Sequence, residues 1–318
     1  MLCVLTPSGA DAGAGDAAEG TLARGSAPAA VEPPEVRPIV LVHGYGSAPD
    51  IWRGAELQLR EAGFDPIAVQ WRPEPGQRAP QVAVHGLRPA IDVALSERGY
   101  APDARFHAVG HSMGGLLLRF LIEHPWADVD RAWPHGGWTG DGVPDGDPAF
   151  AGRVASLVMI STPNQGARTG VALAACGVYR DPDWRPLGCD LAPKSPFVRH
   201  LGHRKTPGVD LPYLAIGVVT PAPFFFVAPY DGDGDGIARQ HDHAVMAEAV
   251  AMDGEPFALW RAWQQADHFH VTCSAEVLGW VADFAREGKV PPAIGPRRRS
   301  ENACRSISKR AFWESRAR

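Results

Sequence analysis

Ser112 lies at the centre of Gly110-His111-Ser112-Met113-Gly114, a G-x-S-x-G pattern. An apolar run ends just before the pattern and a run with helical spacing begins at Gly115, which predicts a strand, a sharp turn and a helix. A serine hydroxyl is a weak nucleophile at neutral pH, so it requires an adjacent base and donors for the oxyanion it creates. The turn exposes such a hydroxyl, and its glycines let strand and helix pass closely. The pattern therefore predicts a nucleophilic serine, although a chain with 35 glycines can also hold an incidental serine in such a turn.

A second glycine motif lies earlier, where the apolar run of residues 39–42 leads into His43-Gly44-Tyr45-Gly46. The two motifs resemble those of the α/β-hydrolase superfamily, in particular its bacterial lipases and carboxylesterases. In that family the loop after an early strand and the residue after the nucleophile each donate a backbone N–H to the oxyanion. The resemblance implies that Tyr45 and Met113 are these donors. His43 is expected to brace the loop, because it precedes the serine and so does not fit the family's chain order.

In this family the acid follows the serine along the chain and the histidine comes last. After Val219 the sequence offers three acids, Asp231, Asp233 and Asp235. The resemblance favours Asp235, because the stretch Asp235-Gly236-Ile237-Ala238 matches the form in which lipases carry their acid.

The same aspartates also fit the opening of a calcium loop, Asp-x-Asp-x-Asp-Gly. In that alternative Asp231 and Asp233 hold the cation while Asp235 still serves the triad. However, no amphipathic helix precedes Asp231, and Asp242 stands where a calcium loop usually has its bidentate glutamate. We therefore expect no metal and no cofactor, with calcium as the alternative.

The base is expected in Asp267-His268-Phe269-His270, just before the last stretch with helical spacing. The resemblance favours His268, and His270 is the alternative, because spacing alone does not separate two histidines in one loop. In either case the imidazole takes the proton of Ser112 and returns it to the leaving alkoxide, while the acid orients the ring.

The chain has 318 residues, of which 45% are apolar and 21% charged, enough for one α/β domain with a sizeable core. The sequence predicts strands over residues 39–42, 66–71, 105–109, 154–160 and 211–219. It predicts helices over residues 49–62, 80–98, 113–124, 243–251 and 274–286. This alternation indicates a doubly wound, mostly parallel sheet with loop or cap insertions at residues 125–152 and 162–210, which we expect to shape the pocket. No apolar stretch approaches the length of a membrane-spanning helix.

The two ends differ from this domain, which is expected over residues 36–288. Residues 1–35 are rich in Ala, Gly and Pro and predict a flexible leader. Residues 289–318 hold nine Lys or Arg against two Glu and predict a disordered basic tail. Since the whole chain has a net charge of −5, its body is acidic, which argues against a nucleic-acid partner.

Cys176 and Cys189 flank a short loop rich in Gly and Pro and could close a bridge. The region resembles secreted bacterial lipases, which have similar cysteine pairs. A bridge implies an oxidising compartment, so the enzyme is expected to be secreted or periplasmic. The alternative is a pair of free thiols in a cytoplasmic enzyme, and the N-terminus has no complete signal-peptide pattern.

These residues predict a lipase or esterase that cleaves carboxylic esters through an acyl-serine intermediate. Phe224, Phe225 and Phe226 would suit an acyl chain, with plain core packing as the alternative. The expected partners are a small-molecule or lipid ester and, transiently, a lipid interface. An acyltransferase with the same triad and a non-catalytic hydrolase-like binding protein are the competing functions.

Overall fold

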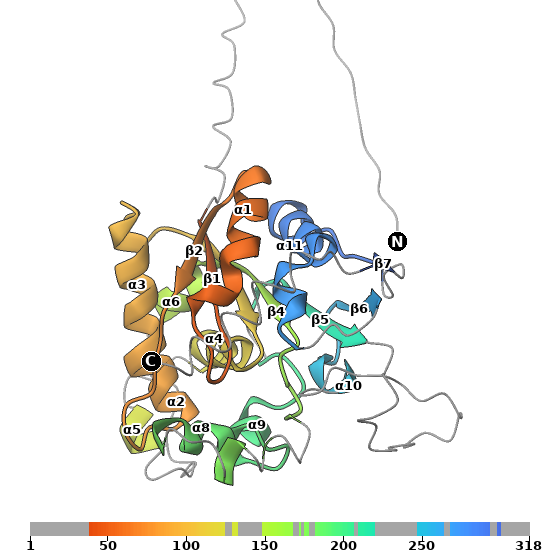
Figure 1. The fold of residues 1–318 in the computed structure, drawn as a ribbon. Coiled ribbons are helices and arrows are strands. Elements are labelled where there is room, and N and C mark those ends of the chain that lie inside the picture. Colours follow the sequence, from red (N-terminus) through yellow and green to blue (C-terminus); the bar gives the residue numbers. More distant parts are fainter. Residues whose placement is uncertain are drawn as a thin grey trace, which may run out of the picture. The chain divides into compact units, whose positions relative to one another are not determined.

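The computed structural model describes part of the chain: residues 38–124, 129–132, 148–167, 172, 175–177, 182–206, 209–219, 247–263, 268–292 and 298–299. The chain divides into two units, Met1–Glu35 and Val36–Arg318. All described residues belong to the second unit, whose ribbon is drawn in Figure 1.

A single sheet with strand order β2-β1-β3-β4-β5-β6-β7 forms the centre of the described structure, and all its pairings are parallel. The strands are β1 (Pro38–Val42), β2 (Asp65–Val69), β3 (Phe106–His111), β4 (Val154–Ile160), β5 (Tyr213–Val219), β6 (Phe257–Trp263) and β7 (Arg298–Arg299). The prediction of a doubly wound, mostly parallel sheet is confirmed. The short strand β7 lies within the segment for which the sequence predicted disorder.

Helices separate the strands as expected for a doubly wound fold (Figure 1). They are η1 (Pro49–Trp52), α1 (Arg53–Glu61), α2 (Ala79–Gln81), η2 (Val82–Leu87), α3 (Arg88–Glu97), α4 (Met113–Glu123), α5 (Val129–Ala132), α6 (Pro148–Arg153), η4 (Pro182–Trp184), α8 (Arg185–Asp190), α9 (Pro196–Leu201), α10 (Ala247–Val250), η5 (His270–Cys273) and α11 (Ala275–Glu287). The five predicted helices all have counterparts. The short helices α5, α8 and α9 lie inside the two insertions, and α6 ends one residue beyond the first. No helix was predicted in these stretches.

The central strand β1 is buried on both faces of the sheet, which is why it is a continuous apolar run. In β1, Ile39 and Leu41 face the core formed with α1 and α11, whereas Val40 and Val42 face the core formed with α3 and α4. All five residues of β1 are buried. Because the strands are parallel, their carboxyl ends meet at one edge, and the loops after β1 and β3 are therefore neighbours there.

One strand of the sheet, β6, was missed by the sequence prediction. Ala258 and Trp260 are buried while Phe257 and Leu259 are half-buried, so one face of this strand is less covered than in β1. Its residues include Ala, Leu and Arg, which suit a helix as well as a strand. Pairing with β5, from Ala215 onward, decides between the two.

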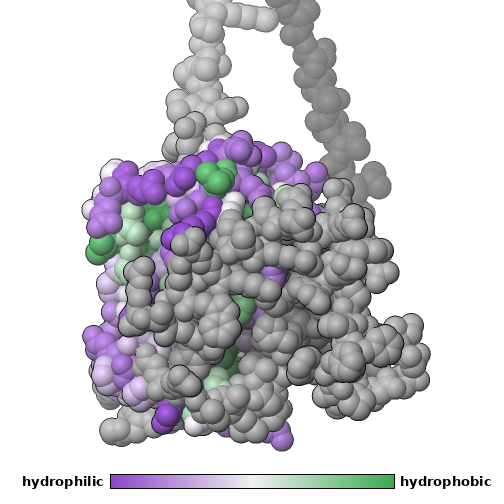
Figure 2. Space-filling model, in the orientation of Figure 1, coloured by the Kyte–Doolittle hydropathy of each residue, from purple (hydrophilic) through white to green (hydrophobic). Residues whose placement is uncertain are grey.

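The described surface is mainly hydrophilic in the orientation of Figure 2, with small apolar spots. Among the described residues, the large apolar side chains that are exposed are Leu57 on α1, Val93 on α3 and Val290. These lie on separate elements and single exposed apolar residues are ordinary. None of the described helices is long and apolar enough to cross a membrane.

Candidate active site

Ser112 occupies the single residue between the end of β3 and the start of α4. Its backbone has φ 53° and ψ −127°, in a region that side chains other than glycine rarely adopt. The neighbouring strand β4 holds Ser112, because the N–H of Ser112 donates to the carbonyl of Ile160 at 2.9 Å. On the helix side, the carbonyl of Ser112 accepts from the N–H of Gly115 at 3.1 Å. A strained serine at a strand-to-helix turn is the geometry of a nucleophile elbow.

The glycines around Ser112 allow backbones to approach each other. A Cβ on Gly114 would lie 2.5 Å from the carbonyl oxygens of both Val42 and His43. A Cβ on Gly110 would collide with Gly115, and one on Gly115 would collide with Thr162. The close passage of strand and helix that the sequence suggested is thus present in the structure.

The loop after β1 passes directly beside the serine. A Cβ on Gly44 would lie 2.7 Å from the Cβ of Ser112, so a side chain at position 44 would push the loop away. Tyr45 follows in this loop, and Met113 is the first residue of α4. The first N–H groups of a helix have no partner within the helix and carry partial positive charge, so Met113 is suited to donate to an anion. Its role and that of Tyr45 as oxyanion donors stay predictions.

His43 is packed as a brace of this loop. Its ring stacks on that of Trp71 with centroids 4.9 Å apart and an interplanar angle of 6°. Its Nδ1 donates to the carbonyl of Gly44 at 3.0 Å, and its own carbonyl accepts from the Trp71 indole at 3.1 Å. Burial lowers the pKa of His43 from 6.5 to about 4, so the ring is neutral near pH 7. These contacts agree with a supporting role.

The turn that precedes α11 brings His268 to the end of β3. The Nε2 of His111 donates to the backbone carbonyl of His268 at 2.7 Å, and the two rings lie 4.6 Å apart. Both histidines are buried. The turn that carries the expected base therefore contacts the residue that immediately precedes Ser112. His270 begins η5 two residues later and is also buried.

The turn with His268 is tied to the body of the protein at its far end. Thr272 donates from its hydroxyl to the carbonyl of Ile51 at 3.1 Å, which links η5 to η1. The hydroxyl of Ser274 then caps α11 by accepting from the N–H of Val277. The turn that carries His268 is therefore held between β3, η1 and the start of α11.

The expected acid and the proposed acyl wall lie outside the described residues. This applies to Asp235, to the calcium alternative at Asp231 and Asp233, and to Phe224, Phe225 and Phe226. Within the described ranges no cluster of three His, Cys, Asp or Glu could hold a metal ion. The roles given to these residues stay predictions.

The stretch Ser161-Thr162-Pro163-Asn164 after β4 supports the elbow from the other side. Thr162 fills the space that Gly115 leaves open, and Asn164 accepts from the guanidinium of Arg119 on α4 at 3.0 Å. Ser161 is the other non-glycine residue with positive φ, 49°, in the described part of the chain. The stretch therefore packs on α4, the helix that follows Ser112.

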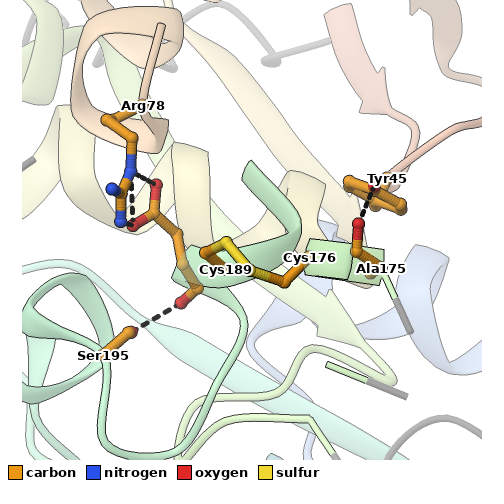
Figure 3. Close-up of a disulfide and its surroundings, with 7 residues drawn as sticks. Tyr45, Arg78, Ala175, Cys176, Cys189 and Ser195 are labelled. Carbon is orange, nitrogen blue, oxygen red and sulfur yellow. Dashed lines mark hydrogen bonds and ion pairs between the residues drawn. A yellow bond between two sulfur atoms is a disulfide. The ribbon is translucent and has the colours of Figure 1, made fainter. Parts of the chain in front are cut away.

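The suspected bridge is present: Cys176 and Cys189 form a disulfide with a Cα–Cα distance of 4.5 Å (Figure 3). It belongs to the insertion between β4 and β5. Sequence reasoning missed two aromatic residues that support the loop after β1, Trp71 and Trp184, whose rings lie 5.3 Å apart. A signal was available for Trp71, because it follows β2 at the same sheet edge as His43.

Comparisons with known proteins identify the fold. No protein-family model matches the chain, and no curated protein matches it. The lipase BlEst2 of Bacillus licheniformis in its mature form is similar in structure, with a TM-score of 0.50, 16% identity, and coverage of 76% of this chain and 89% of that one. Its propeptide form gives a TM-score of 0.55 at 14% identity, covering 83% of this chain and 53% of that one. Phospholipase PlaB of Legionella pneumophila gives a TM-score of 0.51 at 10% identity, covering 88% of this chain and 62% of that one. Together with the parallel sheet and the strained serine between β3 and α4, these likenesses show that the chain has the α/β-hydrolase fold.

Proposed function

We propose that this protein is a carboxylic ester hydrolase that works through an acyl-serine intermediate. The observation that carries the proposal is the backbone of Ser112, which is strained at φ 53° and lies between β3 and α4. Such strain persists only where the surroundings enforce it, and here the hydrogen bonds of the Ser112 backbone to Ile160 and Gly115 hold it. Ser112 stands at the edge of the sheet where the loop after β1 passes its Cβ and where the His268 turn contacts His111.

In the proposed reaction Ser112 attacks the ester carbonyl while His268 accepts the hydroxyl proton. The backbone N–H groups of Tyr45 and Met113 bind the oxyanion of the tetrahedral intermediate. His268 then protonates the leaving alkoxide, and water hydrolyses the acyl-serine by the reverse sequence of proton transfers. Asp235 is proposed to orient the His268 ring and to stabilise its charged form.

Esters are the favoured substrate class because the fold neighbours include a lipase and a phospholipase. The chain offers Phe224, Phe225 and Phe226 beside the proposed acid as a wall for an acyl chain. The disulfide between Cys176 and Cys189 supports a secreted or periplasmic location, because such bonds persist in oxidising compartments.

The test is a series of p-nitrophenyl esters from acetate to palmitate, hydrolysed by the wild type and by Ser112→Ala. We expect the variant to lose roughly three to six orders of magnitude in kcat, with its fold intact by circular dichroism. A fluorophosphonate should label Ser112 in the wild type, as read by mass spectrometry. Hydrolysis by Ser112→Ala at the wild-type rate would contradict the proposal and favour a binding protein. Transfer of the acyl group to an added alcohol in preference to water would indicate an acyltransferase.

The base is identified by replacing His268 and His270 separately with alanine. We expect His268→Ala to cost roughly three to six orders of magnitude in kcat, as the loss of a triad base does elsewhere. His270→Ala should retain activity within about tenfold, since its role would be packing. The reverse pattern would move the base to His270 without changing the proposed reaction.

A further inference from the structure

The loop that carries Tyr45 is held by a segment far along the chain. The Tyr45 hydroxyl donates to the carbonyl of Ala175 at 3.2 Å, across 130 positions of sequence. Its ring also meets that of Trp184 edge-on, with centroids 5.4 Å apart. Figure 3 shows this hydroxyl pointing at Ala175, next to the Cys176–Cys189 bridge.

The bridge fixes the position of the group that accepts this hydrogen bond. Ala175 directly precedes Cys176, and Cys189 lies in α8. On the α8 side, Gly188 packs so closely that a Cβ there would lie 2.5 Å from the carbonyl carbon of Ala175. Residues 175–177 and 182–190, called here the disulfide segment, therefore meet at the acceptor of Tyr45.

The disulfide segment is in turn anchored to the body of the domain. Asp190, next to Cys189, has a fully buried side chain that forms an ion pair with Arg78 and accepts from the N–H of Ala79 at 2.9 Å. Its backbone carbonyl accepts from the hydroxyl of Ser195 at 2.7 Å. These contacts, visible in part in Figure 3, join the segment to the starts of α2 and α9.

A second route from the same segment reaches the other side of the loop. Trp184 contacts Trp71, whose ring stacks on His43 and whose indole N–H binds the His43 carbonyl. His43 and Tyr45 flank Gly44, the residue whose backbone lies against Ser112. The segment thus holds the loop on both sides of its contact with the serine.

We propose that the disulfide segment positions the loop of residues 43–46 after β1, called here the oxyanion loop. In this proposal the Tyr45 side chain and Trp184 are positioning residues for the Tyr45 N–H. The inference rests on the proposed function, because it concerns a donor to the tetrahedral intermediate. Oxyanion donors work by being fixed in place before the charge develops, and small displacements are costly. Since the oxyanion exists only in the transition state and intermediate, loosening the loop lowers kcat more than it changes KM.

The test is a double-mutant cycle on p-nitrophenyl butyrate hydrolysis. It joins Tyr45→Phe, which removes only the hydroxyl, with the bridge-free variant Cys176→Ser/Cys189→Ser. We expect each variant to lower kcat about fivefold to tenfold, with KM changed by less than about twofold. The combined variant should be no slower than about tenfold below wild type, because both changes break the same connection.

Tyr100→Phe is the matched control. In the wild type the Tyr100 hydroxyl donates to Asp65 at 3.0 Å. Asp65 is the first residue of β2, so this contact lies at the amino ends of the strands, opposite to the carboxyl ends where Ser112 lies. This variant loses a comparable phenol hydrogen bond and should retain the wild-type kcat. A kcat loss in Tyr100→Phe equal to that in Tyr45→Phe would overturn the inference.

Two other outcomes would also overturn the inference. One is a combined variant whose kcat loss equals the product of the two separate losses, and the other is an unchanged kcat in Tyr45→Phe. If the bridge-free variant does not fold, Trp184→Phe takes its place in the cycle and is judged by the same criterion. The proposed function is tested separately by Ser112→Ala. If Ser112→Ala is inactive and the two changes in the cycle act independently, only the positioning role is contradicted. If Ser112→Ala is active, the proposed function itself is contradicted.

Discussion

The Nε2 of His111 donates a 2.7 Å hydrogen bond to the backbone carbonyl of His268, across 157 positions of sequence. The rings of the two residues also lie against each other, 4.6 Å apart. Trp52 meets the His111 ring edge-on and holds it in place. Because His111 precedes Ser112, this contact joins the end of the strand that presents the nucleophile to the turn that carries the proposed base.

Removing the His111 donor should loosen the His268 turn from the end of β3, where Ser112 follows. We expect His111→Phe to lower kcat by about tenfold to a hundredfold, because the His268 turn loses its fixed distance from Ser112. It should also lower the unfolding free energy by about 1–3 kcal/mol, since a buried carbonyl loses its partner. Steady-state kinetics and urea unfolding give the two values.

His107→Phe is the control for this variant. His107 lies at the other end of β3 and makes a buried 2.8 Å hydrogen bond to the hydroxyl of Ser156. It should lose stability to a similar degree while keeping its kcat. Equal kcat losses in both variants would show that His111 acts through stability alone.

The local parts of the site could be predicted from sequence. The G-x-S-x-G pattern predicted the strand, turn and helix around Ser112, because the close approach of Gly110 and Gly114 to neighbouring backbone leaves few other residues at those positions. Strands β1 to β5 were predicted because they supply buried apolar side chains to the cores on both faces of the sheet and are therefore rich in Val, Ile and Leu.

Contacts between distant segments could not be predicted in this way. Neither the spacing nor the composition of the chain indicates that Trp184 meets Tyr45, or that His111 binds the backbone of His268. Such contacts depend on how the insertion and the last turn fold over the sheet edge. The cysteine pair did give a signal, but that signal concerned the bridge and not what it supports.

The space at Gly114 should tolerate no side chain. In Gly114→Ala the new methyl group would lie 2.5 Å from two carbonyl oxygens, those of Val42 and His43, so the helix or the oxyanion loop must shift. We expect a loss of about 1–3 kcal/mol in unfolding free energy and a fall in kcat of at least about tenfold. Thermal unfolding and hydrolysis assays measure both.

Gly279→Ala is the matched control, because Gly279 lies within α11 and a Cβ there would meet nothing within 4 Å. This variant should gain up to about 1 kcal/mol, as alanine favours helix over glycine. A similar loss in both variants would mean that the close approach at Gly114 has no special cost.

The buried ring of His43 should make stability depend on pH. Its pKa is lowered from 6.5 to about 4 by burial, so between these values the unfolded chain binds a proton that the folded protein excludes. Stability is therefore full above about pH 6.5 and falls as the pH drops toward 4, by up to about 3 kcal/mol from this residue.

His43→Phe keeps a ring against Trp71 but does not titrate. Urea unfolding at pH 7 and at pH 4.5 should show a smaller loss on acidification in the variant than in the wild type, whatever its absolute stability. The buried His124, whose pKa burial lowers to about 3, and His200 keep part of the acid sensitivity in both proteins. The same loss in variant and wild type would contradict a buried neutral His43.

The ion pair between Arg119 and Glu123 anchors the nucleophile helix at its far end. Both side chains are fully buried, 2.8 Å apart, and Glu123 also accepts from Tyr213 at 3.0 Å. Glu123→Gln would leave the Arg119 charge without its counterion, at a cost of about 3–5 kcal/mol in unfolding free energy.

Arg98→Gln, which breaks the partly exposed pair with Asp65, should cost less than about 1 kcal/mol. Chemical unfolding compares the two, and equal costs would contradict the burial of the pair. Because Glu123 lies a full helix length from Ser112, kcat of the folded variant at low temperature should stay within about threefold of wild type.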